Sequence, residues 1–100
     1  MPLSFLQKLV IAPDVLCRVI GDETVLLNLK TELYLGLDVV GTRMWAVLQE
    51  SASIEDAYHV LAGEYEVAPD ELRRDVGEFV AELLAQTLVQ VVPAEAPRGA

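Results

Sequence analysis

The sequence of 100 residues predicts a single α+β domain in which a small antiparallel sheet precedes three helices. Two observations predict this class. Apolar residues alternate with other residues over positions 15–37, and turn residues interrupt the alternation twice. From Asp38 onward, apolar residues instead recur at the spacing of a helix. Strand patterns followed by helix patterns are typical of α+β folds.

Three short strands are predicted, over residues 15–20, 25–29 and 33–37. Gly21-Asp22 is suited to the first turn and Lys30-Thr31-Glu32 to the second. On the middle strand, we expect Leu27 to lie on the inner face. Such a meander is only marginally stable alone, so other elements must cover its apolar face.

Three helices are predicted next, over residues 39–50, 54–65 and 69–88. Asp38 is a good N-cap for the first helix, and Ser53 begins an approximate capping box for the second. Pro69 stands in the first turn of the third, where its missing N–H is tolerated. "VQVV" after the third helix is compatible with a short final strand. We therefore expect one domain over residues 13–92, with an N-terminal tail over 1–12 and a flexible tail over 93–100.

The order of the helices, two short and one longer, resembles that of a winged helix-turn-helix fold, which usually binds DNA. The charge opposes this use, because seven basic residues against sixteen acidic ones give a net charge of −9. On the third helix, Arg73 and Arg74 are outnumbered by acidic residues. We therefore expect no nucleic acid partner, and a DNA-binding regulator is the less favoured alternative.

Composition also bears on the compartment. No apolar run is long enough to span a membrane, and Gln7 and Lys8 interrupt the apolar stretch at the N-terminus. Cys17 is the single cysteine, so no internal disulfide can form, and its place in a strand pattern predicts a buried apolar role. The expectation is a cytoplasmic protein with no membrane partner.

Residues that could carry enzyme chemistry are few. His59 is the only histidine and no cysteine lies near it in the sequence, so a solvent-facing position on the second helix is expected, not a metal site. No glycine-rich phosphate loop is present, and Trp45 is expected in the core. The sequence therefore predicts no enzyme activity, no cofactor and no metal.

The third helix carries two adjacent rows of residues that could each form a buried face. One row is Leu72, Val76, Phe79 and Leu83, and the other is Arg73, Gly77, Val80 and Leu84. Two interpretations remain open. The helix has one wide buried stripe, with Gly77 leaving room for another element of this chain. Alternatively, the second row is one wall of a groove, and the edge of the third strand accepts a peptide as an added strand.

The segment "VLLNLKTELYLGLDVVGTRMW" resembles the signature of the PqqD-like family, named for pyrroloquinoline quinone biosynthesis. The matching residues are Tyr34, Leu37, Asp38, Gly41, Met44 and Trp45. "SIEDAYHVLAGEYEV" and "DVGEFVAELLAQTLV" resemble later parts of the family pattern, so the resemblance covers about residues 13–92. Glu32 departs from it, because relatives often carry glycine there.

This resemblance implies a non-catalytic, winged-helix-like domain that recognises the leader segment of a ribosomally made precursor peptide. It would present that peptide to a modifying enzyme or a protease, with a lasso-peptide or related pathway preferred. The leader would pair with the third strand and pack on the third helix. The expected peptide-binding residues are Leu33, Tyr34, Leu35, Arg73, Arg74, Gly77, Val80, Ala81 and Leu84.

Within this predicted site, Arg73 and Arg74 are candidates to pair with leader carboxylates. Replacing Val80 by Asp is expected to abolish binding while the fold survives. The main alternative is a self-associating module, in which the same edge forms a dimer.

Overall fold

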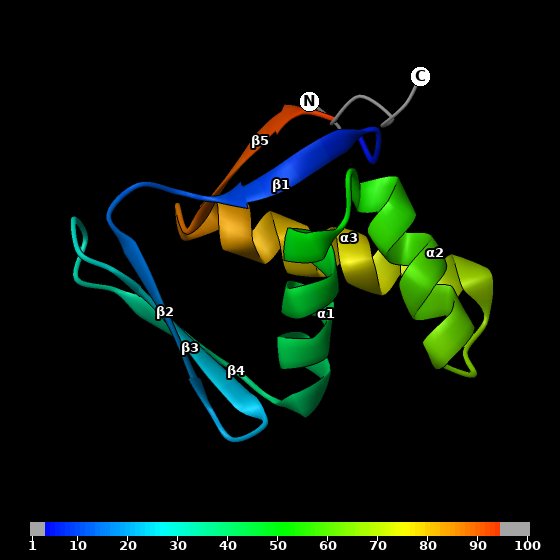
Figure 1. The fold of residues 1–100 in the computed structure, drawn as a ribbon, viewed down its shortest axis with the longest axis horizontal. Helices are drawn as coiled ribbons and strands as arrows, with labels where there is room; N and C mark the ends of the chain where they lie inside the picture. Colours follow the sequence, from blue (N-terminus) through cyan, green and yellow to red (C-terminus); the bar gives the residue numbers. More distant parts are fainter. Residues whose placement is uncertain (1–3, 95–100) are drawn as a thin grey trace.

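The computed structural model describes residues 4–94, which form a three-stranded antiparallel sheet, three helices and a separate two-stranded ribbon. The elements are β1 Gln7–Ile11, β2 Val15–Ile20, β3 Glu23–Asn28, β4 Tyr34–Leu37, α1 Val39–Glu50, α2 Ile54–Glu64, α3 Pro69–Ala85 and β5 Val89–Pro93. Sheet β2-β3-β4 followed by α1, α2 and α3 confirms the predicted α+β class (Figure 1).

The prediction of an N-terminal tail over residues 1–12 is wrong for Gln7–Ile11, which form β1. β1 pairs antiparallel with β5, with Leu9 opposite Val91, and Leu9 is only 1% exposed. The Lys8 ammonium donates to the Gln49 and Ser51 carbonyls at the end of α1, at 3.2 and 2.6 Å. The expected final strand is confirmed as β5, which includes Pro93. Residues 95–100 of the flexible tail predicted over 93–100 lie outside the described residues.

The predicted β2 and its turn are confirmed, whereas the inner face of β3 differs from the prediction. Gly21 takes the left-handed conformation, with φ 66°, in the two-residue turn between Ile20 and Glu23. On β3, Leu26 is fully buried and Leu27 lies on the opposite face. The reason is register, because β3 begins earlier than predicted and pairs Leu26 with Leu35 of β4.

The helices begin where the sequence predicts. The Asp38 carboxylate accepts from the Gly41 N–H at 2.8 Å, and the Ser53 hydroxyl accepts from the Asp56 N–H at 3.1 Å. α3 ends at Ala85, earlier than the predicted residue 88, because Thr87 adopts a left-handed φ of 55°. The Leu88 N–H then bonds the Leu83 carbonyl at 3.0 Å, which closes the helix in a Schellman motif.

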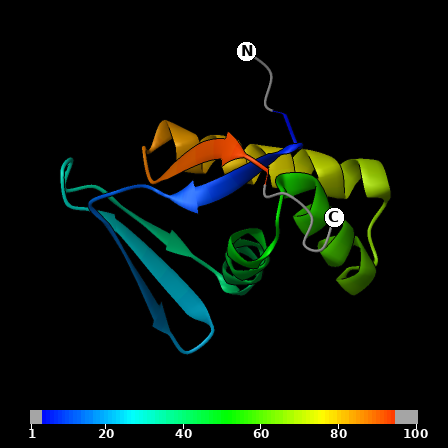
Figure 2. The ribbon, with the colours of Figure 1, turned by 45° about the horizontal axis from the view of Figure 1, so that its top comes forward.

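The core lies where the three helices meet β1, β3, β4 and β5. Trp45 is buried there, as predicted. Cys17 is exposed, contrary to prediction, because β2 is an outer strand of the sheet and most of its residues on both faces lack cover. Figure 2 shows α1 end-on between the sheet on one side and the β1–β5 ribbon with α3 on the other.

Candidate functional site

Strand β4 is an edge of the sheet and joins directly to α1. The strand order β2-β3-β4 leaves β4 hydrogen-bonded to β3 alone within residues 4–94. Asp38, the residue after β4, caps α1, so the edge strand is held rigidly on the helical core. An unpaired strand edge offers main-chain N–H and C=O groups to another strand.

The register of β3 and β4 identifies which main-chain groups face outward. The Asn28 N–H donates to the Leu33 carbonyl at 2.9 Å, so these two residues form a hydrogen-bonded pair. Because such pairs alternate along an antiparallel ladder, Leu35 and Leu37 also bond to β3. The N–H and C=O groups of Tyr34 and Gly36 therefore point away from the sheet, towards the free edge.

The three edge residues predicted from the sequence occupy different environments. The Tyr34 side chain is 73% exposed and that of Leu33, which precedes β4, is 54% exposed. Leu35 is partly buried and packs against the core. Sequence reasoning missed Gly36, although an added Cβ there would meet nothing within 4 Å and its φ is not left-handed. A glycine inside a strand often marks a place where another backbone approaches closely, and here neither crowding nor a left-handed φ explains the glycine.

The helix wall predicted on α3 is wrong at two positions. Val80 is 0% exposed and belongs to the core, so its side chain forms no surface. A Cβ added at Gly77 would lie 3.8 Å from the Phe5 ring, so the chain's own N-terminal segment covers this glycine. For both residues, the structure supports the wide buried stripe. Of the remaining residues, Ala81 is exposed and Leu84 is half-buried.

Arg73 and Arg74 are both exposed, but Arg73 is engaged in contacts within the chain. The Arg73 guanidinium donates two hydrogen bonds to the Glu55 carboxylate of α2, at 3.1 and 2.8 Å. It also lies over the rings of Phe5 and Tyr58, 4.3 and 5.1 Å from their centroids. The hydrogen bonds from Arg73 lower the pKa of Glu55 and raise that of Arg73 itself. Arg73 therefore fastens α3 to α2 and the N-terminal segment.

The flank of α3 opposite Gly77 carries Phe79, which is half-buried. Two residues turn a helix by about 200°, so Phe79 and Gly77 face in nearly opposite directions. Phe5 covers the Gly77 flank of α3, so Phe79 lies on the other flank, where it packs against the edge of the core.

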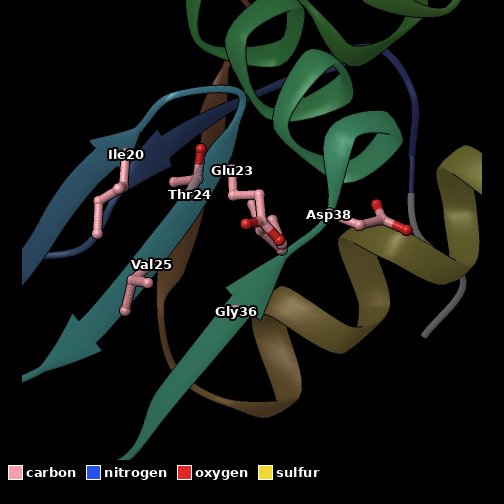
Figure 3. A pocket seen from close by; sticks show the side chains of 7 residues that line it. Ile20, Glu23, Thr24, Val25, Gly36 and Asp38 are labelled. Carbon is pink, nitrogen blue, oxygen red and sulfur yellow. The ribbon is translucent and has the colours of Figure 1, made fainter.

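A pocket lies at the end of the sheet where β4 meets α1 (Figure 3). Apolar and acidic residues line it, namely Ile20, Glu23, Thr24, Val25, Gly36, Leu37 and Asp38. The Thr24 hydroxyl is buried and has no hydrogen-bond partner. The pocket contains neither a nucleophile–base pair nor a metal-ligand set.

The remaining candidates for enzyme chemistry lie elsewhere. His59 is on the surface of α2, as predicted, with its Nε2 3.0 Å from the Glu55 carboxylate. Among residues 4–94, no three side chains of the metal-binding types gather into a possible metal site. None of the helices in this described part is long and apolar enough to cross a membrane.

Comparison with known proteins identifies similar chains. The family model of coenzyme PQQ synthesis protein D (PqqD) matches residues 23–89. The chain is 35% identical to TbiB1, solved in complex with the TbiA(beta) leader peptide, with a TM-score of 0.72 over 80% of this chain and 93% of that one. It also shares its fold with lasso peptide synthetase B1 complexed with the leader peptide, with 21% identity and a TM-score of 0.72 over 83% of this chain and 98% of that one. No curated protein matches the sequence significantly.

Proposed function

Because this chain belongs to the PqqD family, we propose that it binds the leader segment of a ribosomally made precursor peptide as an added strand on β4. It would act without catalysis, presenting the peptide to a modifying enzyme or protease of a lasso-peptide or related pathway. TbiB1, the similar chain described above, was solved with a leader peptide bound. The cytoplasmic location expected from the sequence is part of this proposal.

The observation that carries the proposal is the free edge of β4. Tyr34 and Gly36 direct their main-chain groups outward, where a second strand can bond to them. Exposed Leu33 and Tyr34 offer apolar contact beside these groups. Main-chain hydrogen bonds supply affinity in this mode of binding, and neighbouring side chains select the peptide.

On α3, we propose Phe79 as the main apolar contact. Phe79 is half-buried and lies on the flank of α3 that Phe5 leaves uncovered, whereas Arg73, Gly77 and Val80 are occupied within the fold. Ala81, Leu84 and Arg74 keep some exposure and stay candidates at the border of the site. Leu35 contributes by supporting the edge from its inner face.

A fluorescence-polarisation titration tests the function. The protein is titrated into labelled leader peptides from precursors encoded beside its gene, with competing duplex DNA present. Saturable binding to one leader supports the proposal, and no binding to any leader contradicts it. Light scattering with and without the peptide tests self-association. A dimer that persists in saturating peptide would favour the alternative, in which a strand edge pairs with a second copy of the chain.

Two variants at one position test the mode of binding. Gly36→Pro removes an outward N–H without removing a bond to β3, whereas Gly36→Ala keeps that N–H and fits the free space at Cβ. We expect about tenfold weaker leader binding in Gly36→Pro and near wild-type binding in Gly36→Ala. Equal affinities for the two variants, both folded by circular dichroism, would rule out strand addition at this edge.

A further inference from the structure

Asn28 lies where three loops meet, which join β1 to β2, β3 to β4 and α3 to β5. Asp14, Glu32 and Thr87 are the non-glycine residues with left-handed φ within residues 4–94, at 65°, 62° and 55°. They belong to three loops that are far apart in the sequence. Left-handed φ is unfavourable for such residues, so surrounding contacts must hold each loop in place.

Hydrogen bonds tie all three loops to Asn28 or to its neighbour. The Asn28 side-chain amide donates to the Thr87 carbonyl at 3.0 Å and to the Thr87 hydroxyl at 2.9 Å. The Asn28 carbonyl accepts from the Glu32 N–H at 2.8 Å, and the Leu29 N–H donates to the Asp14 carbonyl at 2.8 Å. Loops 12–14, 29–33 and 86–88 therefore meet at two adjacent residues, Asn28 and Leu29.

The Asn28 side chain suits this position because it both donates and accepts. Its Oδ1 accepts from the N–H groups of Lys30 and Thr31, at 2.9 and 3.2 Å, while its Nδ2 donates to Thr87. The residue is 4% exposed, so water cannot readily replace these partners. An aspartate could accept from the turn but could not donate to Thr87.

The Asn28 contacts connect the two elements proposed to hold the peptide. The Asn28 N–H bonds Leu33, which immediately precedes β4, and the side chain bonds Thr87, which follows α3. Figures 1 and 2 show that β4 and α3 lie closest near this end and diverge towards α1. Asn28 therefore links the start of β4 to the end of α3.

We propose that Asn28 is a positioning residue for the peptide site, holding β4 and α3 at the separation that an added strand requires. It acts through β4 and does not itself contact the peptide. This inference rests on the proposed function, because the separation matters for binding only if a peptide lies on β4.

Asn28→Asp tests the inference against a control that perturbs the fold elsewhere. The variant keeps the size of the side chain but turns the donor facing the Thr87 carbonyl into an acceptor. Ser53→Ala removes the N-cap of α2, remote from β4 in the sequence. We expect both variants to lower the urea midpoint, but only Asn28→Asp to weaken leader binding, by about tenfold, at a temperature where both are folded.

Thr87→Gly gives a second test in case Asn28→Asp fails to fold. Glycine accepts the left-handed φ and keeps the carbonyl, but it loses the hydroxyl that Asn28 contacts. The urea midpoint should hold or rise while leader affinity falls by about threefold. A purely structural role for the contact would not separate stability from affinity in this way.

A readout that needs no peptide keeps this inference distinct from the proposed function. Spin labels on Gly36→Cys and Glu78→Cys, in a Cys17→Ser background, report the distance between β4 and α3. We expect a longer and broader distance distribution with Asn28→Asp or Thr87→Gly, and no change with Ser53→Ala. If the parent protein binds no leader, the proposed function fails and this distance decides the structural inference. An unchanged distance, or unchanged affinity in a parent that binds, overturns the role of Asn28.

Discussion

Arg73 is a cation on the surface whose charge is used within the chain. Its guanidinium is shared between the Glu55 carboxylate and the rings of Phe5 and Tyr58. These partners come from α2 and from the N-terminal segment, and the sequence gives no local sign that they meet α3. For this reason, the sequence suggested Arg73 as a free partner for a leader carboxylate, whereas the structure assigns it to the packing of α3.

The pairing of Arg73 with Glu55 predicts a dependence of stability on pH. Hydrogen bonds from Arg73 lower the pKa of Glu55 in the folded state. The pair therefore stabilises the fold above the usual carboxyl pKa, and this contribution is lost as the pH falls through the lowered pKa. We expect Glu55→Gln to reduce the free energy of unfolding by about 1 kcal/mol or less at pH 7, and the deficit to shrink in acid.

Urea unfolding of both proteins at several pH values between neutral and strongly acidic checks this prediction. Glu66→Gln is a suitable control, because it removes an exposed carboxylate from the loop before α3. A deficit in Glu55→Gln that stays constant with pH would contradict the role given to the ion pair.

At the scale of the element, α3 shows what periodicity leaves undecided. Both of its rows repeat at helical spacing, and they lie side by side on the helix. The buried residues, Leu72, Val76, Val80 and Leu83, take members from both rows. Which residues become buried depends on Phe5 and β1, which come from the other end of the chain, and on β5, which pairs with β1.

Neighbouring substitutions on α3 test this assignment. Val80→Asp would place a carboxylate in the core and cost about 4 kcal/mol or more, which we expect to unfold the domain. Ala81→Asp adds the same group at the next, exposed position and should leave the fold intact. Circular dichroism and urea unfolding compare the two. A folded Val80→Asp protein of near-normal stability would restore the groove wall first predicted.

Local signals account for the elements that the sequence predicted well. Gly21, Asp38 and Ser53 each fix a turn or a helix start through bonds within a few residues. β1 was missed because its partner β5 lies at the other end of the chain, so no local sequence pattern indicates the pairing. The predicted end of α3 was too late in the sequence, because the helix ends at the left-handed conformation of Thr87, which is usually adopted by glycine.

At the scale of the whole molecule, the fold joins an open sheet edge to a well-packed helical core. The family resemblance seen in the sequence is confirmed by the match over residues 23–89. Tyr34 and Gly36 could be placed at the edge only once the register of β3 and β4 was known. The peptide-binding roles of Leu33, Tyr34 and Leu35 stay predictions, as do those of Arg74, Ala81 and Leu84 on α3. The expectation that nucleic acid is not a partner, which rests on the net charge of −9, also stays a prediction.

Amide hydrogen exchange, followed residue by residue by NMR with and without saturating leader peptide, tests the central claim most directly. In the free protein, we expect rapid exchange at Tyr34 and Gly36 and protection at Leu35 and Leu37, because only the latter pair bonds β3. Added leader should slow exchange at Tyr34 and Gly36 by at least about tenfold. Binding that leaves both amides unprotected would contradict strand addition on β4.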